Sequence, residues 1–337
     1  MDIGSGPRSK DSVLIGEGSY GCVVRPPHHC KKSKIHHKKN EKTVGKIILK
    51  KDAEIELQIG TLIKGITGWE NYFIVQEEDH CDHANFKEIR KQYTEECKIL
   101  QSEHIRNTQL TQVVSIYGGK TLFDTLPTSS FNYMKTLRHM LEAIDKLLKQ
   151  GICHFDLKEN NVVVDANSNF RIIDFGGSFV GDKVTEESVW DHIYTFMPEY
   201  NTQPPELSVQ NGINDTTYSR NSLYHDTVYK KFIFTQMETL LGISKKQSLA
   251  DLEKFWRETP VTASWDEFFR KYWRTWDSWA IGVIFLKLLK RCLIYTSFIE
   301  NTWKPHGPVL KGVLRGLLEV DPRKRLLAED ALRLLPS

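Results

Sequence analysis

Apolar and polar residues alternate differently in the two parts of this chain. Up to about residue 118 the apolar residues form short runs bounded by glycine or polar residues, which is typical of β-strands. These runs are 12–24, 43–49, 72–75 and 111–116. Beyond residue 130 apolar residues recur every three or four positions, which is typical of amphipathic helices. The pattern predicts short strands in the first part and helices in the second.

The predicted helices differ in how clearly their ends are marked. Residues 131–150 form an amphipathic helix that ends at Gly151, and 275–290 form an almost wholly apolar one. In the β-rich part a helix is expected over 53–64 with Asp52 as its N-cap. Another helix is expected near 85–100.

Three segments interrupt this pattern. Residues 26–42 are polar and basic and predict a mobile loop. Residues 76–110 insert charged sequence before the last N-terminal strand. Residues 207–274 are rich in aromatic side chains and contain Ser264-x-x-Glu267, a helix-opening pattern, so a folded helical insertion is expected there. That insertion either packs against the helical part or offers a platform to a substrate or partner.

Composition narrows the class of protein. The 337 residues, 40% of them hydrophobic, can bury a large core. A net charge of +3 and a pI of about 8.4 give no argument for a specific nucleic-acid partner. Residues 1–10 lack the apolar core of a signal peptide, and the longest apolar stretch, 280–289, is too short to span a bilayer. We expect a soluble, intracellular protein without a membrane span, and its oligomeric state stays unknown.

The six cysteines show no spacing typical of a disulfide framework, which favours a reducing compartment. Two groups of histidine and cysteine residues are candidate zinc ligands. The first group is His28, His29, Cys30, His36 and His37, and the second is His80, Cys81 and His83. Neither spacing matches a standard zinc site, so a solvated basic loop is the simpler interpretation of the first group.

The stretch from His154 to Gly177 holds the densest set of reactive side chains. Asp156 is followed by Lys158 and Asn161, then by two short apolar runs joined by a polar turn, and then by Asp174-Phe175-Gly176. Two strands joined by that turn would bring Asn161 and Asp174 to one end of a hairpin. Carboxylate and amide oxygens suit a Mg²⁺ ion that also holds substrate phosphates.

These residues resemble the catalytic loop H-R-D-x-K-x-x-x-N and the metal loop D-F-G of eukaryotic protein kinases. One position differs, because Phe155 stands where that family usually has arginine. The resemblance implies that Asp156 orients the substrate hydroxyl and accepts its proton, and that Lys158 steadies the phosphoryl group. It also implies that Asn161 and Asp174 hold Mg²⁺.

The N-terminal part has the nucleotide-binding residues that the resemblance implies. Gly16-x-Gly18-x-x-Gly21 lies between two strands, as in kinases, and not before a helix. Val44-x-Lys46 resembles the strand whose lysine holds the α and β phosphates of ATP. The residues assigned to ATP in this way are Ile15, Gly16, Gly18, Gly21, Val23, Lys46, Glu56 and Tyr117.

Two of these assignments have alternatives. Glu56 is the expected partner of Lys46, and Glu54 is its competitor on the same helix. Tyr117 begins a segment that resembles the hinge between lobes, where backbone groups near 116–118 would meet the adenine edge.

The C-terminal part resembles the same family at three further places. Pro205-Glu206-Leu207 resembles the end of the activation segment, with Met197-Pro198-Glu199 as the alternative. Asp277 begins a D-x-W-x-x-G helix whose aspartate anchors the catalytic loop in the family. Arg325 resembles the arginine that pairs with the Pro-Glu glutamate.

The resemblance implies an α+β, two-lobed kinase fold. A tail at 1–11 is followed by a small β-rich N-lobe at 12–118 and a larger, mainly helical C-lobe at 119–337. The implied activity is transfer of the γ-phosphoryl group of ATP, with Mg²⁺, to serine or threonine of a protein substrate. The chain looks most like kinases of large DNA viruses, which would place it in the host cytoplasm or the virion. A pseudokinase scaffold and a small-molecule phosphotransferase are the alternatives.

Phe155 leads to one expectation about regulation. An aromatic ring lacks the forked donors with which arginine binds a phosphate. Phosphate on an activation-segment residue therefore finds no partner at position 155, and we expect activity without such phosphorylation. The candidate residues are Thr185, Ser188, Thr195 and Thr202. Packing by the aromatic insertion would then order the segment, unless Lys183 or Arg171 replaces the arginine.

Overall fold

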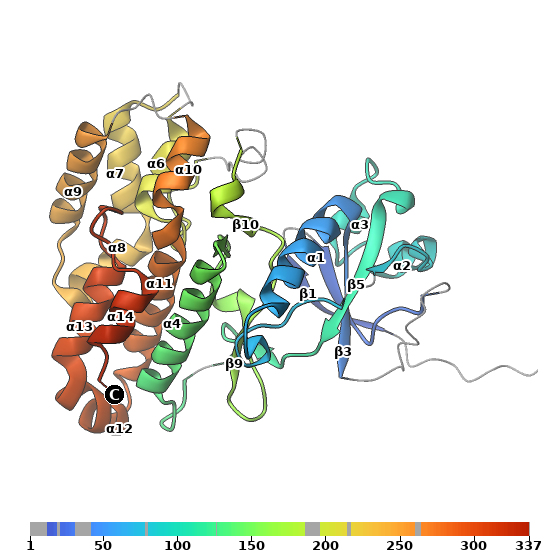
Figure 1. Ribbon diagram of the computed structural model, residues 1–337, viewed down its shortest axis with the longest axis horizontal. Helices are drawn as coiled ribbons and strands as arrows, with labels where there is room; N and C mark the ends of the chain where they lie inside the picture. Colours follow the sequence, from blue (N-terminus) through green and yellow to red (C-terminus); the bar gives the residue numbers. More distant parts are fainter. Residues whose placement is uncertain are drawn as a thin grey trace, which may run out of the picture. The chain divides into compact units, whose positions relative to one another are not determined.

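A computed structural model describes residues 12–18, 21–30, 42–77, 80–125, 127–185, 196–213, 217–259 and 264–336 (Figure 1). The chain divides into two compact units. The N-terminal unit is Met1–Gly119 with Ile173–Gly176, and the C-terminal unit is Lys120–Ile172 with Gly177–Ser337. The first is built on a β-sheet and the second is mainly helical, which confirms the predicted α+β fold.

The N-terminal unit contains an antiparallel sheet in the order β1-β2-β3-β5-β4. Its strands are β1 (Val13–Gly18), β2 (Gly21–Arg25), β3 (Thr43–Leu49), β4 (His80–Cys81) and β5 (Leu110–Ile116). Its helices are α1 (Lys50–Lys64), α2 (Phe86–Tyr93) and α3 (Lys98–Gln101).

The two faces of this sheet are covered by different helices. Because side chains alternate along a strand, Ile47 and Ile48 point to opposite faces. Ile48 packs with Ala53 of α1, whereas Ile47 packs in a cluster with Phe86 of α2 and Leu100 of α3. The 76–110 insertion therefore supplies a hydrophobic layer for the face that α1 does not cover.

The structure corrects three predictions in this unit. No strand forms over 72–75 beyond a bridge at Phe73, since these residues enter the core and β4 pairs with β5 instead. Asp52 is not an N-cap, because β3 runs directly into α1 and Leu49 takes that position. The helix predicted near 85–100 is two helices, because Cys97 has an extended backbone.

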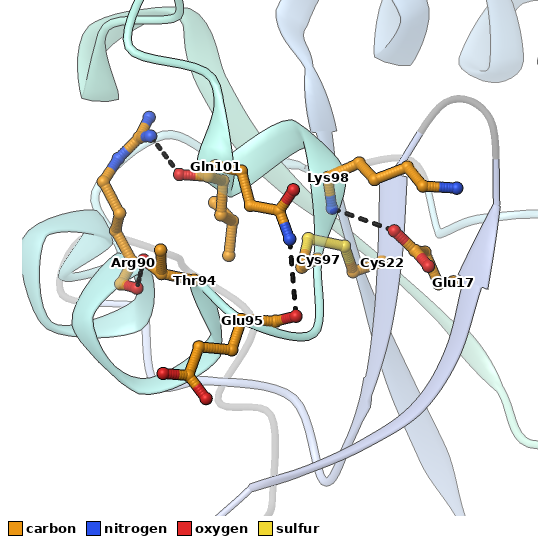
Figure 2. The surroundings of a disulfide bond; sticks show 9 residues. Glu17, Cys22, Arg90, Thr94, Glu95, Cys97, Lys98 and Gln101 are labelled. Carbon is orange, nitrogen blue, oxygen red and sulfur yellow. Dashed lines mark hydrogen bonds between the residues drawn. A yellow bond between two sulfur atoms is a disulfide. The ribbon is translucent and has the colours of Figure 1, made fainter.

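Four cysteines are paired in two disulfides, although their sequence spacing is not typical of a disulfide framework. Cys22 bonds to Cys97 and Cys30 bonds to Cys81, across 75 and 51 residues of sequence. Figure 2 shows the first bond, beside which the Lys98 backbone N–H donates to Glu17 Oε1 at 2.9 Å. Sequence spacing could not show this pairing, because it joins β2 to the loop before α3. Disulfides persist in oxidising surroundings, so the pairing weighs against the reducing compartment expected above.

The second disulfide also bears on the proposed zinc ligands. The bond between Cys30 and Cys81 joins the two histidine–cysteine groups and uses both thiols. Within the described residues no cluster of three or more metal-binding side chains occurs. His36, His37 and most of the loop predicted over 26–42 lie outside the described residues. The described start of this loop is bound to the sheet: the His28 backbone N–H donates to the Gln112 side chain on β5 at 2.8 Å.

The C-terminal unit is built from helices with short strands (Figure 1). Its helices are α4 (Tyr133–Lys149), α6 (Pro205–Gly212), α7 (Arg220–Lys230), α8 (Phe232–Gln236), α9 (Lys245–Glu258), α10 (Trp265–Tyr272), α11 (Trp276–Cys292), α12 (Thr296–Phe298), α13 (Lys304–Leu317) and α14 (Ala328–Leu334). Its strands are β6 (Lys120–Thr121), β7 (Ile152–Cys153), β8 (Val162–Val164), β9 (Phe170–Ile172) and β10 (Phe179–Val180).

Helix α11 forms the centre of this unit, because its residues are buried on every side. Helix α4 packs against it, and the Tyr133 hydroxyl donates to the Phe285 carbonyl at 2.8 Å. The 207–274 insertion is helical as predicted, and Phe234 and Phe269 pack against Trp279 and Trp276 of α11. Among the described helices, none is both long and apolar enough to cross a membrane.

Candidate active site

Asp277 of helix α11 holds the loop that carries Asp156. Asp277 accepts hydrogen bonds from the backbone N–H groups of His154 at 2.7 Å and Phe155 at 3.0 Å. Burial raises the pKa of Asp277 above its ordinary value despite these donors. Phe155 has a φ of 68°, a conformation that is rare for an aromatic residue. The two anchored N–H groups hold this strained turn in place.

Three side chains surround the Asp156 carboxylate. Lys158 Nζ donates to Oδ2 at 2.7 Å, and Asn161 Nδ2 donates to the same oxygen at 3.1 Å. The Tyr200 hydroxyl donates to Oδ1 at 2.5 Å. The structure therefore brings together three predicted residues, Asp156, Lys158 and Asn161, and adds Tyr200. No sequence pattern marked Tyr200, since it lies 44 residues away along the chain.

A second polar group forms within the N-terminal unit. Lys46 Nζ donates to Asp174 Oδ1 at 2.7 Å and also to Glu56 of α1. Burial lowers the pKa of Lys46, but the nearby carboxylates of Asp174 and Glu56 outweigh it and raise the pKa above its ordinary value. Gln76 donates to the other oxygen of Glu56. Gln76 had no predicted role, and only the folded structure shows this contact.

Glu56, and not Glu54, is the partner of Lys46. Glu56 is completely buried, whereas Glu54 on the same helix is exposed. Only ten residues separate Lys46 from Glu56 along the chain. This short connection suffices because α1 begins directly after β3.

Residues after Asp174 fix its position. Phe175 is fully buried and packs edge-on against Phe73, with ring centroids 6.1 Å apart. A side chain at Gly176 would place a Cβ 2.8 Å from Glu56 Oε1, so it would displace the Glu56 carboxylate. Asp174 itself has a φ of 65°.

The glycine-rich segment forms two antiparallel strands, as predicted. Gly18 pairs with Gly21, while Ser19 and Tyr20 lie outside the described residues. Ile15 on β1 is 46% exposed, and Val23 on β2 pairs with Lys46 on β3. Of the two glycine-containing strands, β2 therefore lies directly beside the strand that carries Lys46.

The segment predicted as the hinge follows β5. The Tyr117 backbone N–H donates to the Lys42 carbonyl at 2.7 Å. The Arg25 guanidinium lies over the Tyr117 ring at 3.9 Å from its centroid. No contact here tests the predicted role of Tyr117 toward adenine.

Phe155 belongs to an aromatic cluster that includes the start of the activation segment. Its ring lies 5.4 Å from Phe179, 5.8 Å from Phe269 and 5.6 Å from Trp276, between centroids. Phe179 belongs to β10, which pairs with β7 before the catalytic loop. Phe269 comes from α10 of the insertion. In place of an arginine–phosphate contact, position 155 thus makes contacts between aromatic rings.

Helix α10 also binds the backbone of this segment. Arg270 donates from Nε and Nη2 to the Val184 carbonyl, at 3.1 and 2.9 Å. Gly181 lies against Trp273, where a Cβ would overlap the indole ring. Of the predicted phosphorylation sites, Thr185 is exposed and Thr202 is buried, while Ser188 and Thr195 lie outside the described residues.

The end of the segment is fixed by a buried ion pair. Arg325 binds Glu206 through two hydrogen bonds of 2.8 and 2.7 Å, and both side chains are fully buried. This confirms Glu206 over Glu199 as the partner of Arg325. A bidentate pair of this kind compensates the cost of burying both charges.

Comparison with known proteins gives consistent matches. The chain spans about a quarter of the length of the curated relatives that it matches. The CBL-interacting serine/threonine-protein kinase 15 of Arabidopsis thaliana is 29% identical over 131 residues, which cover 39% of this chain and 28% of that protein. The CBL-interacting protein kinase 21 of Oryza sativa subsp. japonica is 27% identical over 109 residues, covering 31% and 20%.

The serine/threonine-protein kinase STK11 of Rattus norvegicus is 24% identical over 119 residues, which cover 34% of this chain and 26% of that protein. None of these three relatives bears on the resemblance to viral kinases, which stays a prediction. A family model described as the protein kinase domain matches residues 9–247, more than half of the chain. The chain therefore belongs to the protein kinase domain family.

Proposed function

We propose that this protein is a serine/threonine protein kinase that transfers the γ-phosphoryl group of ATP to a protein hydroxyl. The observation that carries the proposal is the contact of Lys46 with both Glu56 and Asp174. A pseudokinase scaffold usually lacks one of the residues that bind phosphate or metal, whereas this chain has Lys46, Asn161 and Asp174. The two carboxylates offset the cost of removing the Lys46 charge from water and keep it available to a phosphate.

The residues present fit ATP and Mg²⁺ in the chemistry of their donors. Asp174 offers a carboxylate and Asn161 an amide oxygen, and magnesium prefers such hard oxygen ligands. Bound Mg²⁺ would neutralise charge on the phosphates during transfer. Lys46 would hold the α and β phosphates. Backbone N–H groups around Gly16, Gly18 and Gly21 would cover them, together with Ile15 and Val23.

Asp156 would act on the acceptor side. Its carboxylate is oriented by Lys158 and Asn161 through Oδ2 and by Tyr200 through Oδ1. An oriented carboxylate can accept the proton of a substrate hydroxyl as the phosphoryl group is transferred. Lys158 Nζ would then steady the moving phosphoryl group.

Activity without activation-segment phosphorylation is the second part of the proposal. It is supported by the aromatic contacts of Phe155 and by the hydrogen bonds from Arg270 to Val184. Arg171, one proposed substitute for the missing arginine, forms an ion pair with Asp165 at 3.1 Å. Packing by the insertion can therefore order the segment without a phosphate.

The activity is tested by transfer of labelled phosphate from ATP to a mixed protein substrate, with an aminoglycoside panel in parallel. The proposal predicts Mg²⁺-dependent label on serine and threonine of protein. Label on aminoglycosides alone would instead show a small-molecule phosphotransferase. No transfer by folded protein that binds ATP would favour a scaffold.

A further inference from the structure

The C-terminal unit contains a lysine that is completely buried. Lys231 lies between α7 and α8 of the insertion and has no exposed surface. Burial lowers its pKa to about 7, although the carboxylates of Glu199 and Glu206 oppose this. Lysine is rarely buried unless its amine has a specific partner.

The partner lies in the segment just before Glu206. Lys231 Nζ donates to the Tyr200 carbonyl at 2.6 Å. Two residues farther on, the Ile233 backbone N–H donates to Asn201 Oδ1 at 2.7 Å. Trp279 of α11 donates from its indole N–H to the Asn201 carbonyl at 3.0 Å. The insertion and α11 therefore hold the backbone of two consecutive residues.

The side chain of Tyr200 extends from this fixed backbone to Asp156. Its hydroxyl donates to Asp156 Oδ1 at 2.5 Å. The other carboxylate oxygen already accepts hydrogen bonds from Lys158 and Asn161. A carboxylate oxygen has two lone pairs, so Oδ1 can accept from Tyr200 and still accept from a substrate hydroxyl.

We propose that Lys231 is a positioning residue for phosphoryl transfer: it fixes the backbone of Tyr200, whose hydroxyl fixes the carboxylate of Asp156. This inference rests on the proposed kinase function and names the residues through which the insertion acts on that site. Tyr200 lies near the end of the activation segment, and Lys231 lies 31 residues later in the 207–274 insertion.

Two variants and their combination test the connection. Lys231→Met replaces the amine by an apolar chain of similar length, and Tyr200→Phe removes only the hydroxyl. We expect each to lower kcat about tenfold, with the KM for ATP within twofold of wild type. The double variant should lose no more than either single variant, because both act through one connection. Lys230→Met is the matched control, since Lys230 is exposed and pairs with Asp226.

Rates are normalised to the concentration of folded protein, so that a loss of stability does not count as a loss of turnover. A kcat of Lys231→Met within twofold of wild type would overturn the proposal, as would losses that multiply in the double variant. A rise in kcat for Tyr200→Phe would also overturn it, because the hydroxyl would then block Asp156. If Lys231→Met melts below the assay temperature, Lys231→Leu, which also lacks a donor, replaces it and must show the same loss.

Hydrogen–deuterium exchange tests the same connection without catalysis. Amides of 200–203 should exchange faster in Lys231→Met than in wild type or Lys230→Met, and should stay slow in Tyr200→Phe. Unchanged exchange in Lys231→Met overturns the connection. A wild-type protein that transfers no phosphate but shows the expected exchange would reject the kinase function alone.

Discussion

The two groups of candidate active-site residues are held in place by different physical means. In the N-terminal unit Lys46 is held by the charges of Glu56 and Asp174. In the C-terminal unit the loop around Asp156 and the segment after it are held mainly by aromatic rings and by backbone N–H groups that donate to Asp277. An ion pair, between Glu206 and Arg325, fixes the end of that segment. Charged contacts can be exchanged for contacts with a charged ligand, whereas packed rings hold a fixed geometry without one. This difference supports the proposal that the acceptor side is ordered without modification.

The largest losses of kcat are expected when one of the two candidate catalytic carboxylates, Asp156 or Asp174, is replaced. Asp156→Asn should lower kcat by 10²–10⁴, because the amide cannot accept the substrate proton. Asp174→Asn should lower it by 10² or more through loss of a metal ligand. Both variants should melt near the wild-type temperature. Asp251→Asn on α9, a half-buried carboxylate bound only by Gln247 among the described contacts, is the control. Folded Asp156 or Asp174 variants that turn over near the wild-type rate would contradict these roles.

The aromatic contacts of the C-terminal unit should account for several kcal/mol of stability. Phe269 is fully buried against Phe155 and Trp276, so Phe269→Ala should lower the free energy of unfolding by about 3–5 kcal/mol. Phe232→Ala is the control, since Phe232 is 53% exposed, and should change it by under about 1 kcal/mol. Denaturant titration measures both. Equal effects in the two variants would show that the cluster does not hold the segment.

The stability of the N-terminal unit should depend on the disulfide between Cys22 and Cys97. The Cys22→Ser/Cys97→Ser double variant should lose about 2–4 kcal/mol of unfolding free energy, since it frees a long loop in the unfolded chain. Peptide mapping without reductant should recover Cys22 joined to Cys97. Free thiols at both positions in wild-type protein, or unchanged stability in the variant, would exclude this bond.

The folded structure shows why some features were predictable and others were not. The helix 131–150 and the hairpin of β8 and β9 follow from periodicity and turn residues close together in sequence. Asp156, Lys158 and Asn161 could be found because they occupy one short loop. Their roles, however, came from the resemblance.

Contacts between residues far apart in sequence could not be predicted from periodicity or from short motifs. Gln76, Tyr200 and Lys231 each act through a partner 20 to 44 residues away. The disulfide of Cys22 depends in the same way on the folded position of the 76–110 insertion. Asp52 was misplaced because the sequence does not show that β3 continues without a turn into α1.

The smallest of these effects distinguishes two glutamates on one helix. Glu56→Gln should lower kcat/KM for ATP about tenfold (about 1.4 kcal/mol), because Lys46 loses a buried charged partner. Glu54→Gln should stay within twofold, since Glu54 is exposed. Steady-state kinetics with varied ATP measures both. A larger loss in Glu54→Gln would show that the contact of Glu56 with Lys46 has no part in ATP binding.

The most direct test of the account is the initial rate of enzyme that carries no phosphate. The protein is treated with phosphatase, the phosphatase is removed, and transfer is measured before autophosphorylation can restore any phosphate. The proposal that packing by α10 replaces a phosphate in ordering the segment predicts full activity from the first time point. A lag followed by acceleration, or a tenfold loss of rate (about 1.4 kcal/mol in barrier), would contradict the account.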